Sequence, residues 1–216
     1  MKDIPVFTGT HGVATLVLKQ IPWSGCGYVI VRSVWTDAAA FLEECLGFCR
    51  ACGAQQVYAS WGCEDLPAPH GYDMLYLYRE KADLPKGNNL ELEVLSRENG
   101  EEFLAVYNRC FRQVPNAASY GKEDLKRLLG EDTAWLLRRG EACAAIGEIS
   151  TEGLEAVAVL PEYRGLGYDL TLALLEMVPS KTLRLKVAST NQRALALYDR
   201  LGFGKGQIIS RWWKLK

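Results

Sequence analysis

The chain has 216 residues, of which 49% are hydrophobic and 24% charged, and its formal net charge at pH 7 is −1. This balance excludes the concentrated basic surface that nucleic acids or anionic membranes would require. No apolar run reaches the ~18 residues of a membrane-spanning helix, and residues 1–10 lack the apolar core of a signal peptide. We therefore expect a soluble, cytoplasmic protein with free thiols, built as one large domain or two small ones.

The first third of the chain predicts a small α/β unit. Thr36 is the expected N-cap of its helix, and Gly53 is the expected residue just after the helix. The apolar pattern indicates four strands and one amphipathic helix, over residues 12–21, 27–35, 36–53 (the helix), 55–60 and 73–80.

Three thiols in the predicted helix raise the question of a metal cluster. Cys45, Cys49 and Cys52 have the spacing C-x3-C-x2-C, with which some enzymes hold a [4Fe–4S] cluster. On a helix these positions share one face, which Ala38 and Leu42 extend. A cluster needs ligands from a loop that wraps around it. We therefore predict that the three side chains pack in the core, with no iron–sulfur cluster and no metal site.

The polar stretch 81–89 contains proline and glycine and predicts a boundary between domains 1–84 and 85–216. The two halves share a strand–helix–strand pattern that ends in similar sequences at 57–60 and 186–189, which favours a degenerate internal repeat. The second domain predicts strands over 90–95, 134–139, 142–149, 154–160, 182–189 and 207–215, and helices over 99–114, 121–129, 167–178 and 191–203.

One segment of the second domain has the pattern of an anion cradle. An apolar strand stops at Pro161, and Arg164, Gly165, Leu166 and Gly167 then lead directly into a helix. Glycines allow backbone N–H groups to approach a ligand closely, and a helix N-terminus favours negative charge. Arg164 can add a bidentate donor. The pattern favours phosphate or pyrophosphate, and a tight turn with ordinary packing is the alternative.

A second segment runs from a strand end near Ser189 into the last predicted helix. Together the two segments resemble the GCN5-related N-acetyltransferase (GNAT) family, over about residues 90–216. The family signature is V-x-P-x-x-R-G-x-G-x-G/A, followed by N-x-x-A-x-x-L-Y-x-x-x-G-F. The residues that match it are Val159, Pro161, Arg164, Gly165, Gly167, Asn191, Ala194, Leu197, Tyr198, Gly202 and Phe203.

The resemblance implies a mixed α/β (α+β) fold, in which a mostly antiparallel sheet is flanked by helices, preceded by a smaller N-terminal α/β domain of degenerate GNAT-like type. It also implies acetyl-CoA as cosubstrate and an amine-bearing acceptor. Asn191 would approach the pantetheine arm, which would pair with the backbone of Val157, Ala158 and Val159. The pyrophosphate would lie on the N–H groups of Arg164, Gly165, Leu166, Gly167, Tyr168 and Asp169.

The resemblance also implies a catalytic residue, because Tyr198 would donate a proton to the thioester sulfur. A phenol with a reference pKa near 10 suits a thiol whose pKa is about 8.5. The alternative for Tyr198 is a helix residue with its hydroxyl in water. For the base that deprotonates the amine, Glu148, Glu155 and water are alternatives.

Asp169 departs from the family pattern, which has glycine or alanine there. Two unit charges 4 Å apart repel by roughly 4 kcal/mol at an effective dielectric of 20. Either the Asp169 carboxylate points into solvent, or the affinity for acyl-CoA is reduced or lost. We expect direct N-acetyl transfer to a primary amine. The alternative is a non-catalytic protein of the same fold that binds CoA or another ligand, or serves as an interaction module.

Overall fold

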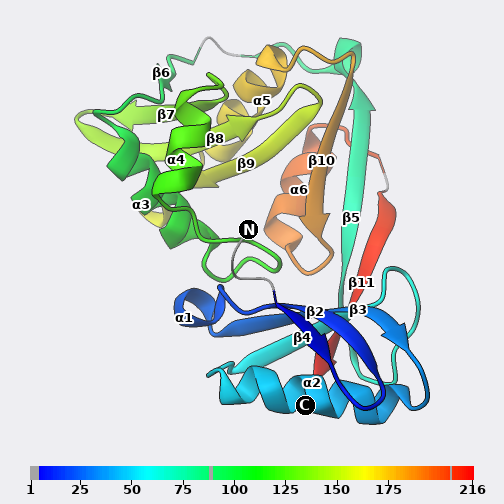
Figure 1. Cartoon of the computed structure of the whole chain (residues 1–216). Coiled ribbons are helices and arrows are strands. Elements are labelled where there is room, and N and C mark those ends of the chain that lie inside the picture. The colour runs from blue at the N-terminus through cyan, green and yellow to red at the C-terminus, as the bar shows by residue number, and fades with distance from the viewer. Residues whose placement is uncertain (1–4, 88–89, 205) are drawn as a thin grey trace. The chain divides into compact units, whose positions relative to one another are not determined.

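Figure 1 shows a computed structural model of the chain, which describes residues 5–87, 90–204 and 206–216. Backbone contacts divide the chain into two compact units: unit 1 comprises Met1–Leu75, Ala188–Thr190 and Ile208–Lys216, and unit 2 comprises Tyr76–Val187 and Asn191–Gln207. This division differs from the predicted boundary between residues 84 and 85, because the C-terminal strand pairs with a strand of unit 1. No described helix is both long and apolar enough to cross a membrane.

Unit 1 contains a sheet with one long helix against it. The strand order is β1-β2-β3-β4-β11-β5, in which β3 and β4 are parallel while β2 and β11 run antiparallel to their neighbours β3 and β4. The sequence did not indicate β1 or α1. The elements of unit 1 are β1 (Val6–Thr8), β2 (Gly12–Val17), α1 (Ile21–Ser24), β3 (Cys26–Val34), α2 (Ala38–Ala51), β4 (Gln56–Ser60), the first part of β5 (His70–Glu80) and most of β11 (Gln207–Leu215).

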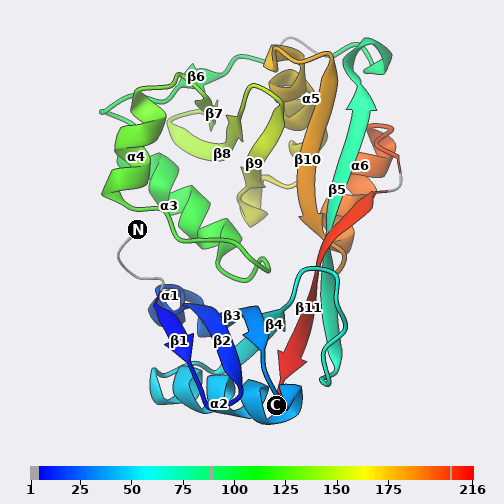
Figure 2. The ribbon, with the colours of Figure 1, turned by 45° about the vertical axis from the view of Figure 1, so that its right-hand side comes forward.

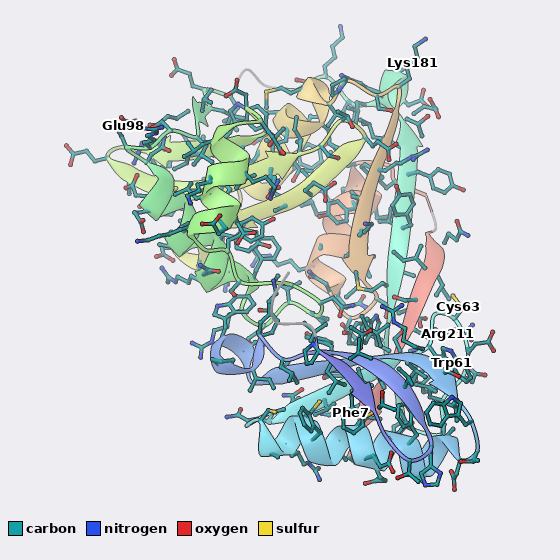
Figure 3. All side chains as sticks on the ribbon, viewed as in Figure 1. Phe7, Trp61, Cys63, Glu98, Lys181 and Arg211 are labelled. Carbon is teal, nitrogen blue, oxygen red and sulfur yellow. The ribbon has the colours of Figure 1, made fainter. Side chains whose placement is uncertain are left out.

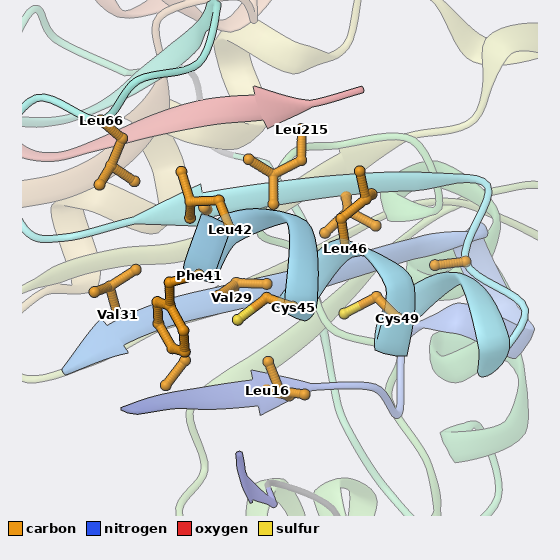
Figure 4. Close-up of a cluster of buried hydrophobic side chains, with 14 of the residues drawn as sticks. Leu16, Val29, Val31, Phe41, Leu42, Cys45, Leu46, Cys49, Leu66 and Leu215 are labelled. Atoms are coloured by element: carbon orange, nitrogen blue, oxygen red, sulfur yellow. The ribbon is translucent and has the colours of Figure 1, made fainter. Parts of the chain in front are cut away.

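Two of the three helical cysteines belong to the buried face of α2 (Figure 4). Cys45 and Cys49 are fully buried among apolar side chains of α2 and the sheet. Burial raises the pKa of Cys45 to about 12 and that of Cys49 to about 11, so both thiols stay protonated. Core packing is confirmed for these two but is wrong for Cys52, which is exposed because it caps the helix end. The described residues hold no group of side chains arranged as metal ligands.

The start of α2 also differs from the prediction. Asp37 is the N-cap, and its carboxylate accepts hydrogen bonds from the N–H groups of Ala39 and Ala40 at 2.9 and 3.1 Å. The Thr36 hydroxyl lies 2.7 Å from the ring nitrogen of His11 instead. A carboxylate at this position also interacts favourably with the helix dipole. The helix ends as expected, and Gly53 follows it with a φ of 91°.

Gly47 lies on the exposed side of α2, and an added methyl group would meet no heavy atom within 4 Å. Glycine inside a helix costs roughly 0.5–1 kcal/mol relative to alanine. We expect Gly47→Ala to raise the free energy of unfolding by about this amount, measured by urea denaturation. Because nothing obstructs the methyl group, a lower free energy of unfolding would contradict this view of α2.

Hydrogen bonds from Arg211 join the proline-bearing loop between β4 and β5 to strand β11 (Figure 3). One guanidinium nitrogen of Arg211 donates to the carbonyl oxygen of Cys63 at 3.2 Å and to the carboxylate of Asp65 at 3.1 Å. Trp61 and Glu64 form an isolated bridge in the same loop. The strand after this loop begins at His70, earlier than the predicted 73, so the loop is shorter than the sequence indicated.

Unit 2 contains a mixed, mostly antiparallel sheet flanked by helices (Figure 2), which confirms the predicted fold class. The strand order is β5-β10-β9-β8-β7-β6. Strands β9 and β10 pair in parallel, and β6 to β9 are successively antiparallel. Its elements are β6 (Glu93–Val94), α3 (Gly100–Phe111), α4 (Lys122–Leu129), β7 (Ala134–Arg139), β8 (Ala142–Ile149), β9 (Gly153–Val159), α5 (Gly167–Met177), β10 (Thr182–Ala188) and α6 (Gln192–Arg200), with short 3-10 turns at Lys81–Asp83 and Pro161–Tyr163.

The central strands β8 and β9 carry helices on both faces. Ile146 and Ala158 belong to a cluster with α3, in which Phe103 is fully buried. The neighbouring residue Gly147 faces the opposite side, where an added methyl group would collide with Leu174 of α5. Because side chains alternate along a strand, the two helices cover opposite faces of the same strands.

Candidate active site

Strands β9 and β10 pair only where β9 begins. The recorded partners are Gly153 with Arg184 and Leu154 with Leu185, and no pairing between the two strands is recorded among the described residues beyond Leu154. On its other side β9 pairs with β8 as far as Val159. Residues 155–159 of β9 therefore have one edge without a partner strand, which we call the open edge (Figure 2).

The alternation of a strand determines which backbone groups face the open edge. The N–H of Leu160 donates to the carbonyl oxygen of Ala144 at 3.0 Å, toward the β8 side. Val157 and Val159 therefore direct their N–H and C=O groups to the open edge, while Ala158 directs its groups to β8. Among the described residues, the Cys110 thiol lies 3.8 Å from the Val159 carbonyl oxygen. Such an edge can bind an extended chain as a neighbouring strand would.

The open edge leads into a turn with exposed backbone, residues 164–167, which we call the glycine turn. Gly165 has a φ of 106°, and a methyl group there would meet no heavy atom within 4 Å. The positive φ requires glycine, and the open space leaves the backbone accessible. Helix α5 begins at Gly167, and its first N–H groups have no acceptor within the helix. The structure thus has the form of the predicted cradle, and anion binding there stays a prediction.

Three elements meet at Gly167. A methyl group on this residue would lie 3.9 Å from Leu197 of α6 and 3.9 Å from Val159 of β9. Helix α6 is capped by Asn191, whose side-chain oxygen accepts from the N–H of Ala194 at 3.2 Å. Asn191 therefore has a structural role at the start of α6, and its contact with pantetheine stays a prediction.

Tyr198 is buried on α6, with 7% of its surface exposed. Most of the side chain is therefore packed inside the protein, and the role of its hydroxyl stays a prediction. Burial raises the pKa of Tyr198 to about 12, and its ring packs edge-on against Phe203 at 6.0 Å between centroids. No hydrogen bond of the hydroxyl with another described residue is recorded. Tyr198 is thus a protonated donor on α6, and its approach to the thioester stays a prediction.

The candidate base Glu148 is buried, and both of its carboxylate oxygens already accept hydrogen bonds. It is 3% exposed, and its two oxygens accept from the Tyr120 hydroxyl at 2.9 Å and from Arg127 at 3.1 Å. Burial raises the pKa of the Glu148 carboxyl, and the two donors oppose this effect. With both oxygens engaged, Glu148 joins strand β8 to Tyr120, which precedes α4.

Sequence reasoning did not single out the partners of Glu148. The Tyr120 ring stacks on that of Tyr107 with 3.7 Å between centroids. Asn108 exchanges two hydrogen bonds of 2.9 Å with the backbone of Tyr120. No motif marks these residues, because they are scattered along the chain and only the folded structure brings them to Glu148.

The other candidate base, Glu155, stands where β9 and β10 separate. The register between β8 and β9 shifts here: Glu148 pairs with Ala156 and Ile149 with Leu154, so Glu155 has no opposite residue. Such bulges re-aim a side chain and are frequent beside active sites. The Glu155 side chain is exposed, so its carboxylate is accessible to a substrate.

Asp169 lies in the first turn of α5, as the sequence indicated. The residue is partly buried, and the direction of its carboxylate relative to a bound pyrophosphate stays a prediction. The preceding residue is Tyr168. The guanidinium carbon of Arg200 lies 4.8 Å from the centre of its ring. A negative charge and a positive charge therefore stand close to the same helix turn.

The sequence matches the acetyltransferase (GNAT) family over residues 95–203, just over half of the chain. The chain belongs to the GNAT family of acetyltransferases. No curated protein matches the chain.

Solved structures share this fold. A GNAT-family acetyltransferase from Colwellia psychrerythraea is 12% identical over 98% of this chain and 84% of its own, with a TM-score of 0.54. A tandem GNAT protein from the clavulanic acid biosynthesis pathway is 13% identical over 99% and 83%, with a TM-score of 0.54. A Drosophila protein is 21% identical over 96% and 75%, with a TM-score of 0.55. At these identities the likeness confirms the fold alone.

Proposed function

We propose that this protein is an N-acetyltransferase that moves an acetyl group from acetyl-CoA directly to a primary amine. Its family and fold support acyl transfer in general. The observation that carries the proposal is the open edge of β9, which continues through the glycine turn to the N-terminus of α5. The edge would bind the amide groups of the pantetheine arm, and the helix N-terminus would bind the pyrophosphate.

The proposed pose fixes the direction of the cosubstrate. With the pyrophosphate on residues 164–169, the pantetheine arm runs back along β9 from Val159 toward Val157. The thioester then approaches the point where β9 and β10 separate, at Glu155. Both oxygens of Glu148 are occupied, so we favour Glu155 as the group that accepts the amine proton.

Tyr198 would act at the leaving group. The neutral amine attacks the thioester carbonyl carbon, the C–S bond breaks, and CoA leaves as a thiolate. The pKa of Tyr198, about 12, exceeds the ~8.5 of a simple thiol. The phenol would therefore stabilise the departing sulfur through a hydrogen bond, and solvent would supply most of the protonation of the free thiol.

A second candidate function is a non-catalytic GNAT-fold protein that binds CoA or another ligand. The observation that favours it is the carboxylate of Asp169 in the first turn of α5. The two functions are separated by measuring thiol release from acetyl-CoA in the presence of a panel of primary amines. Amine-dependent release supports the transferase, and tight binding of acetyl-CoA without release supports the non-catalytic protein. Absence of binding would contradict the proposed site.

Asp169 gives a prediction for cosubstrate affinity. We expect Asp169→Gly to tighten acetyl-CoA binding by roughly three- to ten-fold, because it removes a negative charge beside the pyrophosphate. Isothermal calorimetry measures the effect, and Asp169→Asn is the matched control that removes the charge but keeps the size. If neither variant binds more tightly, the charge does not face the phosphates.

A further inference from the structure

Two residues at positions that the family signature leaves variable meet beside the glycine turn. Tyr168 is the second residue of α5, and Arg200 is the last residue of α6. The guanidinium carbon of Arg200 lies 4.8 Å from the centre of the Tyr168 ring, within the range of a cation–π contact. The signature assigns neither side chain a role.

The surroundings of Arg200 stabilise the positive charge of its own side chain. A positive charge at the end of α6 interacts well with the helix dipole, and the guanidinium group lies within cation–π distance of the Tyr168 ring. The side chain is exposed, and no hydrogen bond or ion pair of Arg200 is recorded among the described residues. Its N–H donors are therefore available around the edge of the group.

A neighbouring arginine lacks this freedom. Arg109 forms an ion pair with Glu162 in the segment just before the glycine turn, at 2.9 Å. The N–H donors of Arg109 are thus engaged by the Glu162 carboxylate. The contact of Arg200 with the Tyr168 ring leaves the N–H donors of Arg200 free to bind a ligand.

We propose that Arg200, supported by Tyr168, binds phosphate oxygens of the coenzyme. This inference rests on the proposed function, which places the pyrophosphate on the first turn of α5. A guanidinium group over Tyr168 stands beside that turn and also offsets the carboxylate of Asp169, the next residue along the helix. CoA offers two phosphate groups of this chemistry, the pyrophosphate and the 3′-phosphate of its ribose.

The test compares the affinities of three ligands by calorimetry: CoA, 3′-dephospho-CoA and pantetheine. We expect Arg200→Ala to weaken CoA binding about three- to ten-fold, the range of a partly exposed charged contact, and to leave pantetheine binding unchanged. Arg200→Lys keeps the charge without the planar stacking and should recover part of the affinity. Arg139→Ala, at an exposed arginine of β7, is the matched control and should not alter it.

The ligands distinguish the outcomes. Equal losses for CoA and 3′-dephospho-CoA assign the contact to the pyrophosphate, and a loss for CoA alone assigns it to the 3′-phosphate; both support the proposal. Unchanged CoA affinity in Arg200→Ala, or the same loss for pantetheine, overturns it while the proposed function stands. A wild-type protein that does not bind CoA would overturn both.

Discussion

Replacing Tyr198 by phenylalanine is expected to lower the kcat of acetyl transfer about 100-fold, the lower end of the usual cost of removing one preorganised hydrogen-bond donor to a developing negative charge. The KM for acetyl-CoA should stay nearly unchanged, because the lost hydrogen bond forms mainly as the sulfur leaves. The ring can keep its packing against Phe203, so the variant should fold. Steady-state thiol release with the best amine of the panel measures both constants.

A matched variant and a pH profile sharpen this test. Tyr78→Phe removes the hydroxyl of an exposed tyrosine on β5 and should leave kcat unchanged. Because the pKa of Tyr198 is about 12, its hydroxyl stays protonated up to about pH 11, and the wild type should lose no activity through it below that pH. A Tyr198→Phe variant as active as the wild type would remove the tyrosine from the mechanism.

Gly153→Ala is expected to destabilise unit 2 by about 3 kcal/mol, the upper end of typical overpacking costs. A methyl group at Gly153 would stand 1.7 Å from the carbonyl oxygen of Arg184. That obstacle is backbone, so β9 and β10 must move apart where Gly153 pairs with Arg184. For a chain of this size the change corresponds to a fall in Tm of roughly 6–12 °C, measured by thermal circular dichroism.

The same substitution elsewhere supplies the control. Gly47→Ala adds an identical methyl group on the exposed side of α2, without a steric obstacle, and is expected to raise Tm slightly. Gly153→Ala should also weaken acetyl-CoA binding, because the open edge begins where these strands join. A Gly153→Ala protein with wild-type Tm would show that the two strands do not approach as closely as the structure has them.

Local patterns predicted most of this fold and the outline of the site. The glycine turn, the capping side chain of Asn191 and the burial of Cys45 and Cys49 each depend on neighbours within one or two helical turns. Such features are written in short stretches of sequence. The choice of Asp37 over Thr36 as N-cap was missed, since both residue types are suitable caps.

Contacts between distant segments could not be predicted in the same way. Sequence alone left Glu148 and Glu155 equivalent as candidate bases. Only the fold shows that Tyr120 and Arg127 occupy the first and that the second sits on a bulge at the open edge. The cation–π contact of Arg200 likewise needs two helices to meet, which no periodicity indicates.

The interleaving of the two units has a consequence for biosynthesis. Strand β11 is the partner of β4, although some 150 residues separate them in the order of translation. Unit 1 can therefore not close its sheet on the ribosome until Leu215 has emerged, by which time all of unit 2 has been made. Domains that are continuous in sequence usually mature one after the other during synthesis. Here the edge of β4 stays unpaired until a segment that follows it by some 150 residues has been made.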